Sequence, residues 1–287
     1  MKRRNFLQSA ALASSATLLA PGALAESLRR ERIKEFGFQS YTVRDFIYKD
    51  MAGTLKRLKK AGYDHMEGFD FNNGKFLGKP LAETMKIVND SKINLKSIHI
   101  MTPNMGDKMQ MTVDQAAETG TEYLVCAFLM PNERQSIDQY KALCEQFNKM
   151  GEASKKAGIQ FAYHNHDFEF QEVDGQIPMD VILKETDSNL VKIELDIYWA
   201  RKAEVNPLNF FRDNLRRVPL WHVKDLSLDE GQPMTEIGNG IIDWRQMFSH
   251  KNDAGLQYFF IEQDANFAED SISSLETSIK YLKKLSY

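Results

Sequence analysis

Apolar and polar positions follow two different patterns that alternate along the chain. From Glu26 onward, short apolar runs bounded by turn residues are each followed by a longer amphipathic segment, without a low-complexity linker. This alternation predicts a parallel sheet whose strands are joined by helices. The eight predicted strands are Phe36–Tyr41, His65–Phe69, Leu95–Met101, Tyr123–Leu129, Gln160–His166, Val191–Tyr198, Pro219–Lys224 and Tyr258–Gln263. The eight predicted helices are Met51–Ala61, Leu81–Ser91, Thr112–Thr119, Ser136–Ala157, Met179–Glu185, Pro207–Asn214, Trp244–Ala254 and Ser271–Leu285.

Glycines mark the ends of three predicted helices. Gly62, Gly158 and Gly255 each follow an alanine and precede a predicted strand, where glycine can adopt the left-handed cap conformation. Eight strand–helix units in roughly 260 residues predict a closed (β/α)8 barrel with its functional residues where the strands end. An open doubly wound sheet is the alternative. It is disfavoured because residues 39–44, after the first strand, contain no glycine-rich nucleotide loop.

Ionisable residues gather at the ends of the predicted strands. His164 and His166 share one face of the fifth strand, because side chains alternate sides along a strand. Either histidine can also be a structural or loop residue, and Glu194 or Asp225 can cap a loop. The other ionisable strand-end residues are Glu67, His99, Asp196, His222, Lys224, Glu262 and Asp264. Because the strand ends of a barrel meet at one mouth, we expect these side chains to lie together.

Three of these residues indicate a metal site. Asp196, His222 and Glu262 each follow apolar residues at a strand end, where an unpaired charge would be costly. A set of carboxylates and imidazole without thiolate suits Mn²⁺, Mg²⁺, Fe²⁺, Co²⁺ or Zn²⁺, and the share of oxygen ligands favours Mn²⁺. We therefore expect one divalent metal ion at the barrel mouth.

Five segments carry a family resemblance. They are residues 163–170 (YHNHDFEF), 195–199 (LDIYW), 222–225 (HVKD), 238–244 (GNGIIDW) and 261–264 (IEQD). After residue 25, almost end to end, the chain resembles the xylose isomerase-like barrel superfamily of sugar isomerases and epimerases. That superfamily also contains inosose dehydratases, 3-oxo-glycoside-processing lyases and endonuclease IV.

The resemblance implies a ligand set of one residue from each of strands five to eight. Its members typically hold a divalent metal with a glutamate, an aspartate, a histidine and a glutamate, and the last three match the residues given above. At the strand-five position this chain has His164, and Glu169 follows a few residues later. We expect His164 to be the fourth ligand, with Glu169 or His166 as alternatives.

The implied chemistry is proton abstraction next to a sugar carbonyl. A divalent ion can polarise the carbonyl and stabilise the enediolate formed when the adjacent C–H is deprotonated. Glu262, His166 or His164 can accept the proton, and Lys224 can contact a substrate oxygen. The residues expected to bind the sugar are Glu67, His99, Tyr198 and Trp199.

The fate of the enediolate decides the reaction. Reprotonation gives isomerisation or epimerisation, which is the predicted activity. Loss of a β-substituent gives a dehydratase or a 3-oxo-glycoside lyase, which is the alternative. His164 keeps the alternative open, because epimerases of this family use two opposed glutamates and this chain has a histidine in place of one.

The overall charge bears on partners. The formal net charge is −3 at pH 7, and no basic stripe is present. Nucleic-acid affinity depends mainly on phosphate neutralisation, so a nucleic-acid partner and a nuclease resembling endonuclease IV are disfavoured. A non-catalytic sugar-binding barrel is the remaining alternative from another class.

The first residues predict export. Arg3 and Arg4 precede an apolar run from Ser9 to Leu19 that is too short for a membrane span, and a small-residue cleavage pattern ends at Ala25. We expect residues 1–25 to be a twin-arginine signal peptide, the export machinery to be a partner, and residues 26–287 to form the barrel in the periplasm. A periplasmic enzyme favours a non-phosphorylated sugar or a 3-oxo-glycoside as substrate.

The chain has only two cysteines, Cys126 and Cys144, which do not make a disulfide framework. Cys126 lies in an apolar run, so we expect it to be a buried free thiol.

Overall fold

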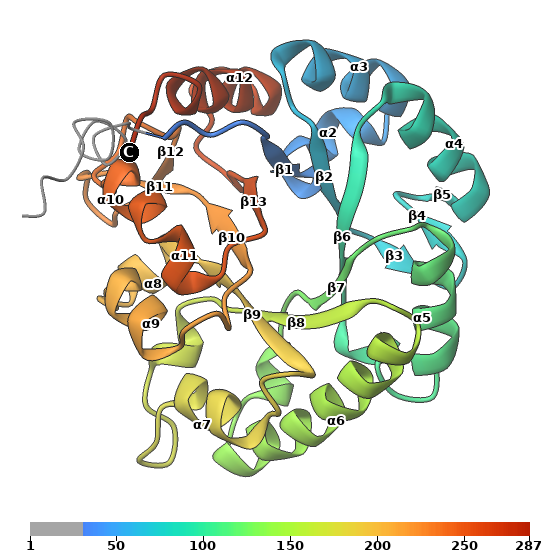
Figure 1. The fold of residues 1–287 in the computed structure, drawn as a ribbon, viewed down its shortest axis with the longest axis vertical. Coiled ribbons are helices and arrows are strands. Elements are labelled where there is room, and N and C mark those ends of the chain that lie inside the picture. Colours follow the sequence, from blue (N-terminus) through green and yellow to red (C-terminus); the bar gives the residue numbers. More distant parts are fainter. Residues whose placement is uncertain (1–30) are drawn as a thin grey trace, which may run out of the picture. The chain divides into compact units, whose positions relative to one another are not determined.

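Eight parallel strands close into a barrel in the computed structural model, which describes residues 31–287 and forms one compact unit from Arg32 to Tyr287 (Figure 1). The predicted signal peptide lies outside the described residues. The strands, in order around the barrel, are β1 (Gly37–Gln39), β2 (His65–Gly68), β6 (Asn94–Ile100), β7 (Tyr123–Cys126), β8 (Gln160–His164), β9 (Val191–Asp196), β10 (Leu220–Val223) and β13 (Tyr258–Ile261). β13 pairs with β1, so the predicted (β/α)8 barrel is confirmed.

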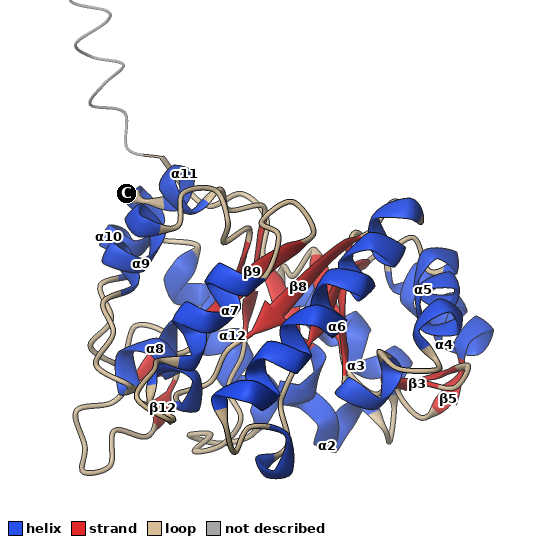
Figure 2. Ribbon diagram, turned by 90° about the horizontal axis from the view of Figure 1, so that it is seen from below, coloured by secondary structure: helices blue, strands red, loops and turns tan. Residues whose placement is uncertain are grey.

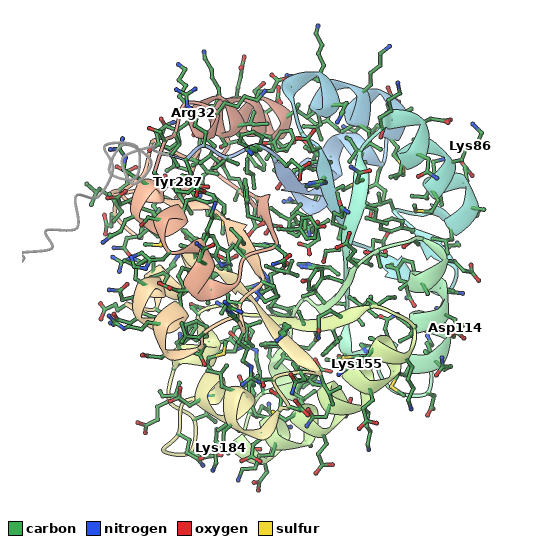
Figure 3. All side chains as sticks on the ribbon, in the orientation of Figure 1. Arg32, Lys86, Asp114, Lys155, Lys184 and Tyr287 are labelled. Atoms are coloured by element: carbon green, nitrogen blue, oxygen red, sulfur yellow. The ribbon has the colours of Figure 1, made fainter. Side chains whose placement is uncertain are left out.

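Helices surround the strands, and Figure 2 shows the sheet enclosed between them. The α-helices are α2 (Arg44–Ile47), α3 (Met51–Ala61), α4 (Leu81–Ser91), α5 (Met109–Glu118), α6 (Ile137–Lys156), α7 (Pro178–Glu185), α8 (Ile197–Lys202), α9 (Pro207–Asp213), α10 (Trp244–Ser249), α11 (Lys251–Ala254) and α12 (Ser271–Leu282). Exposed residues such as Lys86, Asp114 and Lys184 lie on the outer side of this ring (Figure 3). Among residues 31–287, no helix is both long and apolar enough to span a bilayer.

Two apolar cores hold the barrel together. The larger one lies between the strands and the helices and includes Phe147 of α6 and Phe161 of β8. The smaller one fills the barrel interior and consists of Tyr123, Val125, Ala162, Leu220 and Phe260. Because side chains alternate along each strand, His164, His222 and Glu262 also face inward, two positions after Ala162, Leu220 and Phe260.

Closure of the barrel requires glycine in β1. A Cβ atom on Gly37 would overlap the carbonyl oxygen of Phe259 and lie 2.7 Å from the ring of Phe260. The predicted helix-capping glycines are confirmed, because Gly62, Gly158 and Gly255 all have positive φ angles.

The strands β1 and β9 end earlier than predicted because their last residues cap the following helix. The Gln39 side chain accepts a hydrogen bond from the Tyr41 amide and begins a 3₁₀ helix, η1 (Ser40–Val43). Asp196 likewise accepts from the Trp199 amide at 3.0 Å, so the chain is helical from Ile197. β7 and β8 end at Cys126 and His164.

The predicted helix from Trp244 to Ala254 was wrong, since it is two helices. The Ser249 hydroxyl donates to the carbonyl of Gln246, and the His250 amide bonds the carbonyl of Met247 instead. A side-chain donor that takes a backbone acceptor breaks the regular ladder in this way.

Two small sheets and three further 3₁₀ helices were not predicted. The sheets are formed by β3 (Phe71–Asn72), β4 (Lys75–Phe76) and β5 (Lys79–Pro80), and by β11 (Asp225–Leu226) and β12 (Met234–Thr235). The 3₁₀ helices are η2 (Thr102–Asn104), η3 (Pro131–Glu133) and η4 (Phe168–Phe170). Cys126 and Cys144 are both buried and free, as expected for Cys126.

Candidate active site

A cavity of about 650 Å³ lies at the carboxyl ends of the strands. Its aromatic lining consists of Tyr41, Tyr48, Phe69, Phe128 and Trp199. Its ionisable lining includes His99, His164, His166, Lys224, Glu262 and Asp264. The cavity therefore combines apolar surface with charged and imidazole groups, which is typical of a small-molecule site.

The predicted metal ligands come together beside this cavity. One ligand atom from each of Asp196, His222 and Glu262 lies within 4.8 Å of the other two. The Nδ1 atom of His222 is 2.6 Å from Oε2 of Glu262 and 4.0 Å from Oδ2 of Asp196. The Nε2 atom of His164 lies 3.7 Å from the same Asp196 oxygen, so four strands bring four donor groups together.

Asp196 Oδ2 shows that this group suits a cation. The atom is buried and accepts no hydrogen bond, although the ammonium of Lys224 lies 2.9 Å away. A buried carboxylate oxygen is costly unless a cation lies close to it, and here the Lys224 ammonium makes an ion pair with it but no hydrogen bond. With oxygen and imidazole donors around it, the residues fit a divalent ion of the Mn²⁺, Mg²⁺ or Zn²⁺ type.

Lys224 bridges three carboxylates. Its Nζ atom lies 2.9 Å from Asp196, 2.7 Å from Glu262 and 3.0 Å from Asp264. Burial lowers the pKa of Lys224, but these carboxylates outweigh it and raise the pKa well above its usual value. Lys224 is therefore a permanent ammonium that donates hydrogen bonds and does not act as a base.

The groups around Lys224 have different pKa values. Burial raises the pKa of Glu262, but Lys224 and His222 outweigh it, so the net pKa is lowered and Glu262 stays ionised. Burial and the Glu262 charge raise the pKa of Asp264 to about 6. Burial and the Lys224 charge lower the pKa of His166 to about 3, so this imidazole is neutral near pH 7.

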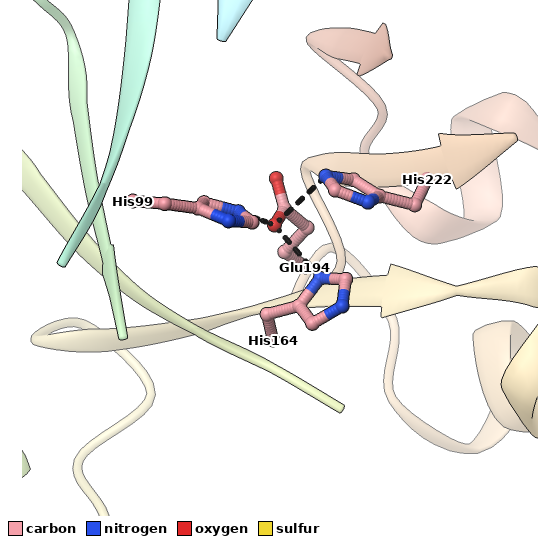
Figure 4. A group of neighbouring side chains, drawn as sticks. All are labelled: His99, His164, Glu194 and His222. Carbon is pink, nitrogen blue, oxygen red and sulfur yellow. Dashed lines mark hydrogen bonds and ion pairs between the residues drawn. The ribbon is translucent and has the colours of Figure 1, made fainter. Parts of the chain in front are cut away.

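Glu194 lies among the imidazole rings of His99, His164 and His222 (Figure 4). The Oε2 atom of Glu194 has three imidazole nitrogens around it: His99 Nε2 at 2.7 Å, His164 Nδ1 at 3.0 Å and His222 Nε2 at 3.2 Å. The strand register explains this arrangement, because His164 of β8 pairs with Glu194 of β9. Burial lowers the pKa of His164, and the neighbouring His222 lowers it further.

Glu67 contacts two of the same imidazole rings. Its Oε2 atom lies 2.5 Å from His222 Nε2 and 3.0 Å from His99 Nε2, and it accepts from Gln39 Nε2 at 2.8 Å. Burial lowers the pKa of His99, but Glu67 and Glu194 outweigh it and raise the pKa to about 9. Glu67 was predicted to bind substrate. Its side chain is fully buried and does not line the cavity, whereas His99 does.

The two predicted aromatic contacts differ. Trp199 lines the cavity. Tyr198 is buried beside it, and its hydroxyl donates to the carbonyl of Gln232 at 3.0 Å. The residues differ because the chain is already helical there, so the alternation of a strand no longer applies.

Glu169 lies apart from the ligand group. It accepts a hydrogen bond from the Tyr163 hydroxyl through Oε1, and one from the His166 amide through Oε2 at 2.7 Å. The structure thus brings His164, and not Glu169, to Asp196. Three further residues belong to the site but were not among the predicted ligands or contacts: Gln39, Glu194 and Asp264. The rule of alternation would have found Glu194, which is two positions before Asp196.

Comparison with known proteins gives relatives that are similar in sequence to part of this chain. An inosose dehydratase from Clostridium perfringens is 25% identical over 165 residues, which is 51% of this chain and 54% of that protein. The chain thus spans about half the length of the curated relatives it matches.

Solved structures extend the comparison. A sugar phosphate isomerase/epimerase from Parabacteroides distasonis has 28% identity and a TM-score of 0.76, covering 87% of this chain and 93% of that one. The IOLI protein, solved with a bound zinc atom, has 14% identity and a TM-score of 0.67, covering 86% and 96%, and shares the fold. The family model for the xylose isomerase-like TIM barrel matches residues 55–285, so the chain belongs to that family.

Proposed function

We propose that the protein is a divalent-metal-dependent sugar isomerase or epimerase that acts through an enediolate on a non-phosphorylated sugar or 3-oxo-glycoside. The single observation that carries the proposal is Asp196 Oδ2, a buried oxygen without a hydrogen bond beside His164, His222 and Glu262. The zinc-bound IOLI protein and the Parabacteroides isomerase/epimerase, which share the fold, support it. We favour Mn²⁺ because two of the four donors are carboxylates.

The four donor residues would hold the ion at the cavity floor. When bound, such an ion acts as a Lewis acid that makes the C–H bond next to a sugar carbonyl more acidic. His166, which lines the cavity with a neutral ring, is the candidate proton acceptor, and substrate binding beside it would have to raise its low pKa for it to act as a base. The Lys224 ammonium donates a hydrogen bond to a substrate oxygen, and Glu262 is the second proton carrier.

Elimination is the second candidate reaction. The match to an inosose dehydratase supports it, and so does Asp264, a carboxyl group in the cavity lining that shares Lys224 with Glu262. Such a group can protonate a leaving oxygen. The two reactions share the first step, and only their products differ.

Solvent deuterium exchange tests the shared step. Purified protein, stripped of metal and then supplied with Mn²⁺, is incubated in D₂O with ketoses and 3-oxo-glycosides. Deuterium in the recovered substrate or in an isomer supports the isomerase, and an unsaturated product selects the lyase. Sugar binding without exchange under any metal would refute both and leave a sugar-binding barrel.

Variants connect the exchange to the site. Glu262→Gln should abolish exchange, whereas Glu236→Gln should retain it, because Glu236 is a buried carboxylate that accepts from Ser274 and Ala268 outside the cavity lining.

Export is a separate proposal for residues 1–25. Mass spectrometry of the periplasmic protein would detect cleavage after Ala25, and an uncleaved cytoplasmic chain would contradict it.

A further inference from the structure

We propose that Glu194 is a positioning residue that keeps the proton of His164 on Nδ1 and so leaves Nε2 as the fourth donor atom toward the metal. The inference rests on the proposed function for the role of Nε2. The placement of the proton is a property of the metal-free protein and can be measured without any metal or substrate.

The two nitrogens of His164 have different surroundings. Nδ1 lies 3.0 Å from Glu194 Oε2, which is hydrogen-bonding distance to a carboxylate oxygen that accepts from an N–H group when it is ionised. Nε2 faces Asp196 Oδ2 at 3.7 Å, which is beyond hydrogen-bonding distance. A proton on Nδ1 is used by Glu194, whereas a proton on Nε2 would leave Glu194 without that donor.

With the proton on Nδ1, the two atoms that face each other across the cavity floor, His164 Nε2 and Asp196 Oδ2, are both hydrogen-bond acceptors. An unprotonated His164 Nε2 and Asp196 Oδ2, which accepts no hydrogen bond, present two lone pairs to the same space. Two acceptors held together in a buried layer repel each other unless a cation lies close to them, and in the metal-free protein the nearby cation is the Lys224 ammonium, 2.9 Å from Asp196 Oδ2. His164 therefore takes the place of the glutamate that the family resemblance implies on strand five, provided that its proton is held on the far side of the ring.

Glu194 is held firmly enough for this role. It is fully buried, and its Oε2 atom also lies 2.7 Å from His99 Nε2 and 3.2 Å from His222 Nε2. The pairing of β8 with β9 places it directly beside His164. A carboxylate or carbonyl that accepts from the second nitrogen of a ligating histidine fixes both its tautomer and its ring orientation.

A deep metal site in this cluster is the competing explanation. His99, His164, Glu194 and His222 are close enough to be considered as ligands. However, a metal ion must lie about 2.0–2.1 Å from each imidazole nitrogen. The position between the three imidazole nitrogens is occupied by the Oε2 atom of Glu194, which lies 2.7–3.2 Å from each of them. These are hydrogen-bonding distances, so the carboxylate accepts from the rings and leaves no space for a metal ion there.

Long-range ¹H–¹⁵N correlation spectra of the metal-free, ¹⁵N-labelled full chain test the proton placement directly. The chain has six histidines, so the His164 signals can be assigned by their loss in His164→Gln. We expect the wild-type ring to be the neutral Nδ1–H tautomer. A neutral Nε2–H ring or a doubly protonated ring in the wild type would overturn the inference, and this result requires no variant to fold.

Metal titration of a variant supplies the second readout. Glu194→Gln should lose the Nδ1–H preference of His164 and raise the dissociation constant for Mn²⁺, measured by calorimetry, by about 10- to 100-fold. Glu236→Gln, a buried carboxylate elsewhere in the fold, should leave both unchanged. If Glu194→Gln folds and keeps both the wild-type tautomer and affinity, Glu194 has no positioning role.

The same experiments separate this inference from the proposed function. A wild-type protein with the Nδ1–H tautomer that binds no Mn²⁺ would refute the metal centre, while the role of Glu194 in placing the proton would stand. A protein that catalyses metal-dependent exchange with a different His164 tautomer would refute the role of Glu194 and leave the function.

Discussion

Replacing Glu169 by glutamine should make the protein more stable than the wild type at neutral and alkaline pH. Glu169 is fully buried in the 3₁₀ helix η4 after β8, where its two oxygens accept from the Tyr163 hydroxyl and the His166 amide. Burial raises the pKa of Glu169 to about 7 against the opposing effect of these two hydrogen bonds. Glutamine retains an oxygen for His166, offers its NH₂ group to Tyr163, and does not ionise.

The size of the effect follows from proton linkage. The folded pKa of about 7 lies above the reference value of 4.5. The folded state therefore binds the proton more tightly, and stability falls as pH rises through the folded pKa. The contribution of protonated Glu169 to the free energy of unfolding is present in full below pH 4.5. A difference of about 2.5 pH units corresponds to ~3.4 kcal/mol, of which about 2–3 kcal/mol is lost between pH 5 and pH 8.

Urea unfolding of wild type and Glu169→Gln at pH 5, 6, 7 and 8 measures this loss. Comparing the two proteins at each pH cancels the titration of groups common to both. The free energy of unfolding of the variant should rise relative to that of the wild type by about 2–3 kcal/mol across the range. Glu145→Gln, at an exposed position of α6, is the control and should show no such trend. A constant difference between wild type and Glu169→Gln at all four pH values would refute the raised pKa.

Three further predictions concern the charged network and the metal. Lys224→Met should tighten Mn²⁺ binding in calorimetry by about tenfold, or ~1.4 kcal/mol, because the ammonium competes for oxygens of Asp196 and Glu262; unchanged or weaker binding would contradict this. Asp225→Asn should lower the free energy of unfolding in urea by about 2–6 kcal/mol, since Asp225 accepts from three backbone amides and the Trp244 indole, and asparagine leaves two donors unpaired. Mn²⁺ at a hundred times its dissociation constant should add about 2.7 kcal/mol and raise the unfolding temperature by roughly 5–10 °C, and no shift in calorimetry would count against the metal centre.

The barrel could be predicted from the sequence because its signals are local and repeated. Each strand-like run is followed by a helical pattern, and glycines such as Gly62 and Gly158 end helices with positive φ angles. The strand ends were less accurate, because Gln39 and Asp196 belong both to a strand and to the cap of the next helix. Strands of two residues, such as β3 and β12, are too short to show any periodicity.

The candidate site could be predicted in part for the same reason. Asp196, His222 and Glu262 were identified because inward positions recur every second residue and strand ends converge. The choice between His164 and Glu169 required the structure. It depends on the Tyr163 hydroxyl and the His166 amide, which engage the Glu169 carboxylate elsewhere.

The balance of charges distinguishes this site from a structural salt-bridge network. The carboxylates that line or underlie the cavity floor are Glu67, Glu194, Asp196, Glu262 and Asp264. Lys224 directs its ammonium to three of them, yet Asp196 Oδ2 still accepts no hydrogen bond.

A buried network kept only for stability would tend to satisfy every oxygen, because each unpaired group costs about 1–3 kcal/mol and a buried ion pair offers little net gain. Three oxygens of this network, Glu67 Oε1, Glu194 Oε1 and Asp196 Oδ2, accept no hydrogen bond. Asp196 Oδ2 differs from the other two because His164, His222 and Glu262 direct donor atoms toward it beside the Lys224 ammonium, and this convergence of donors supports the proposed divalent cation.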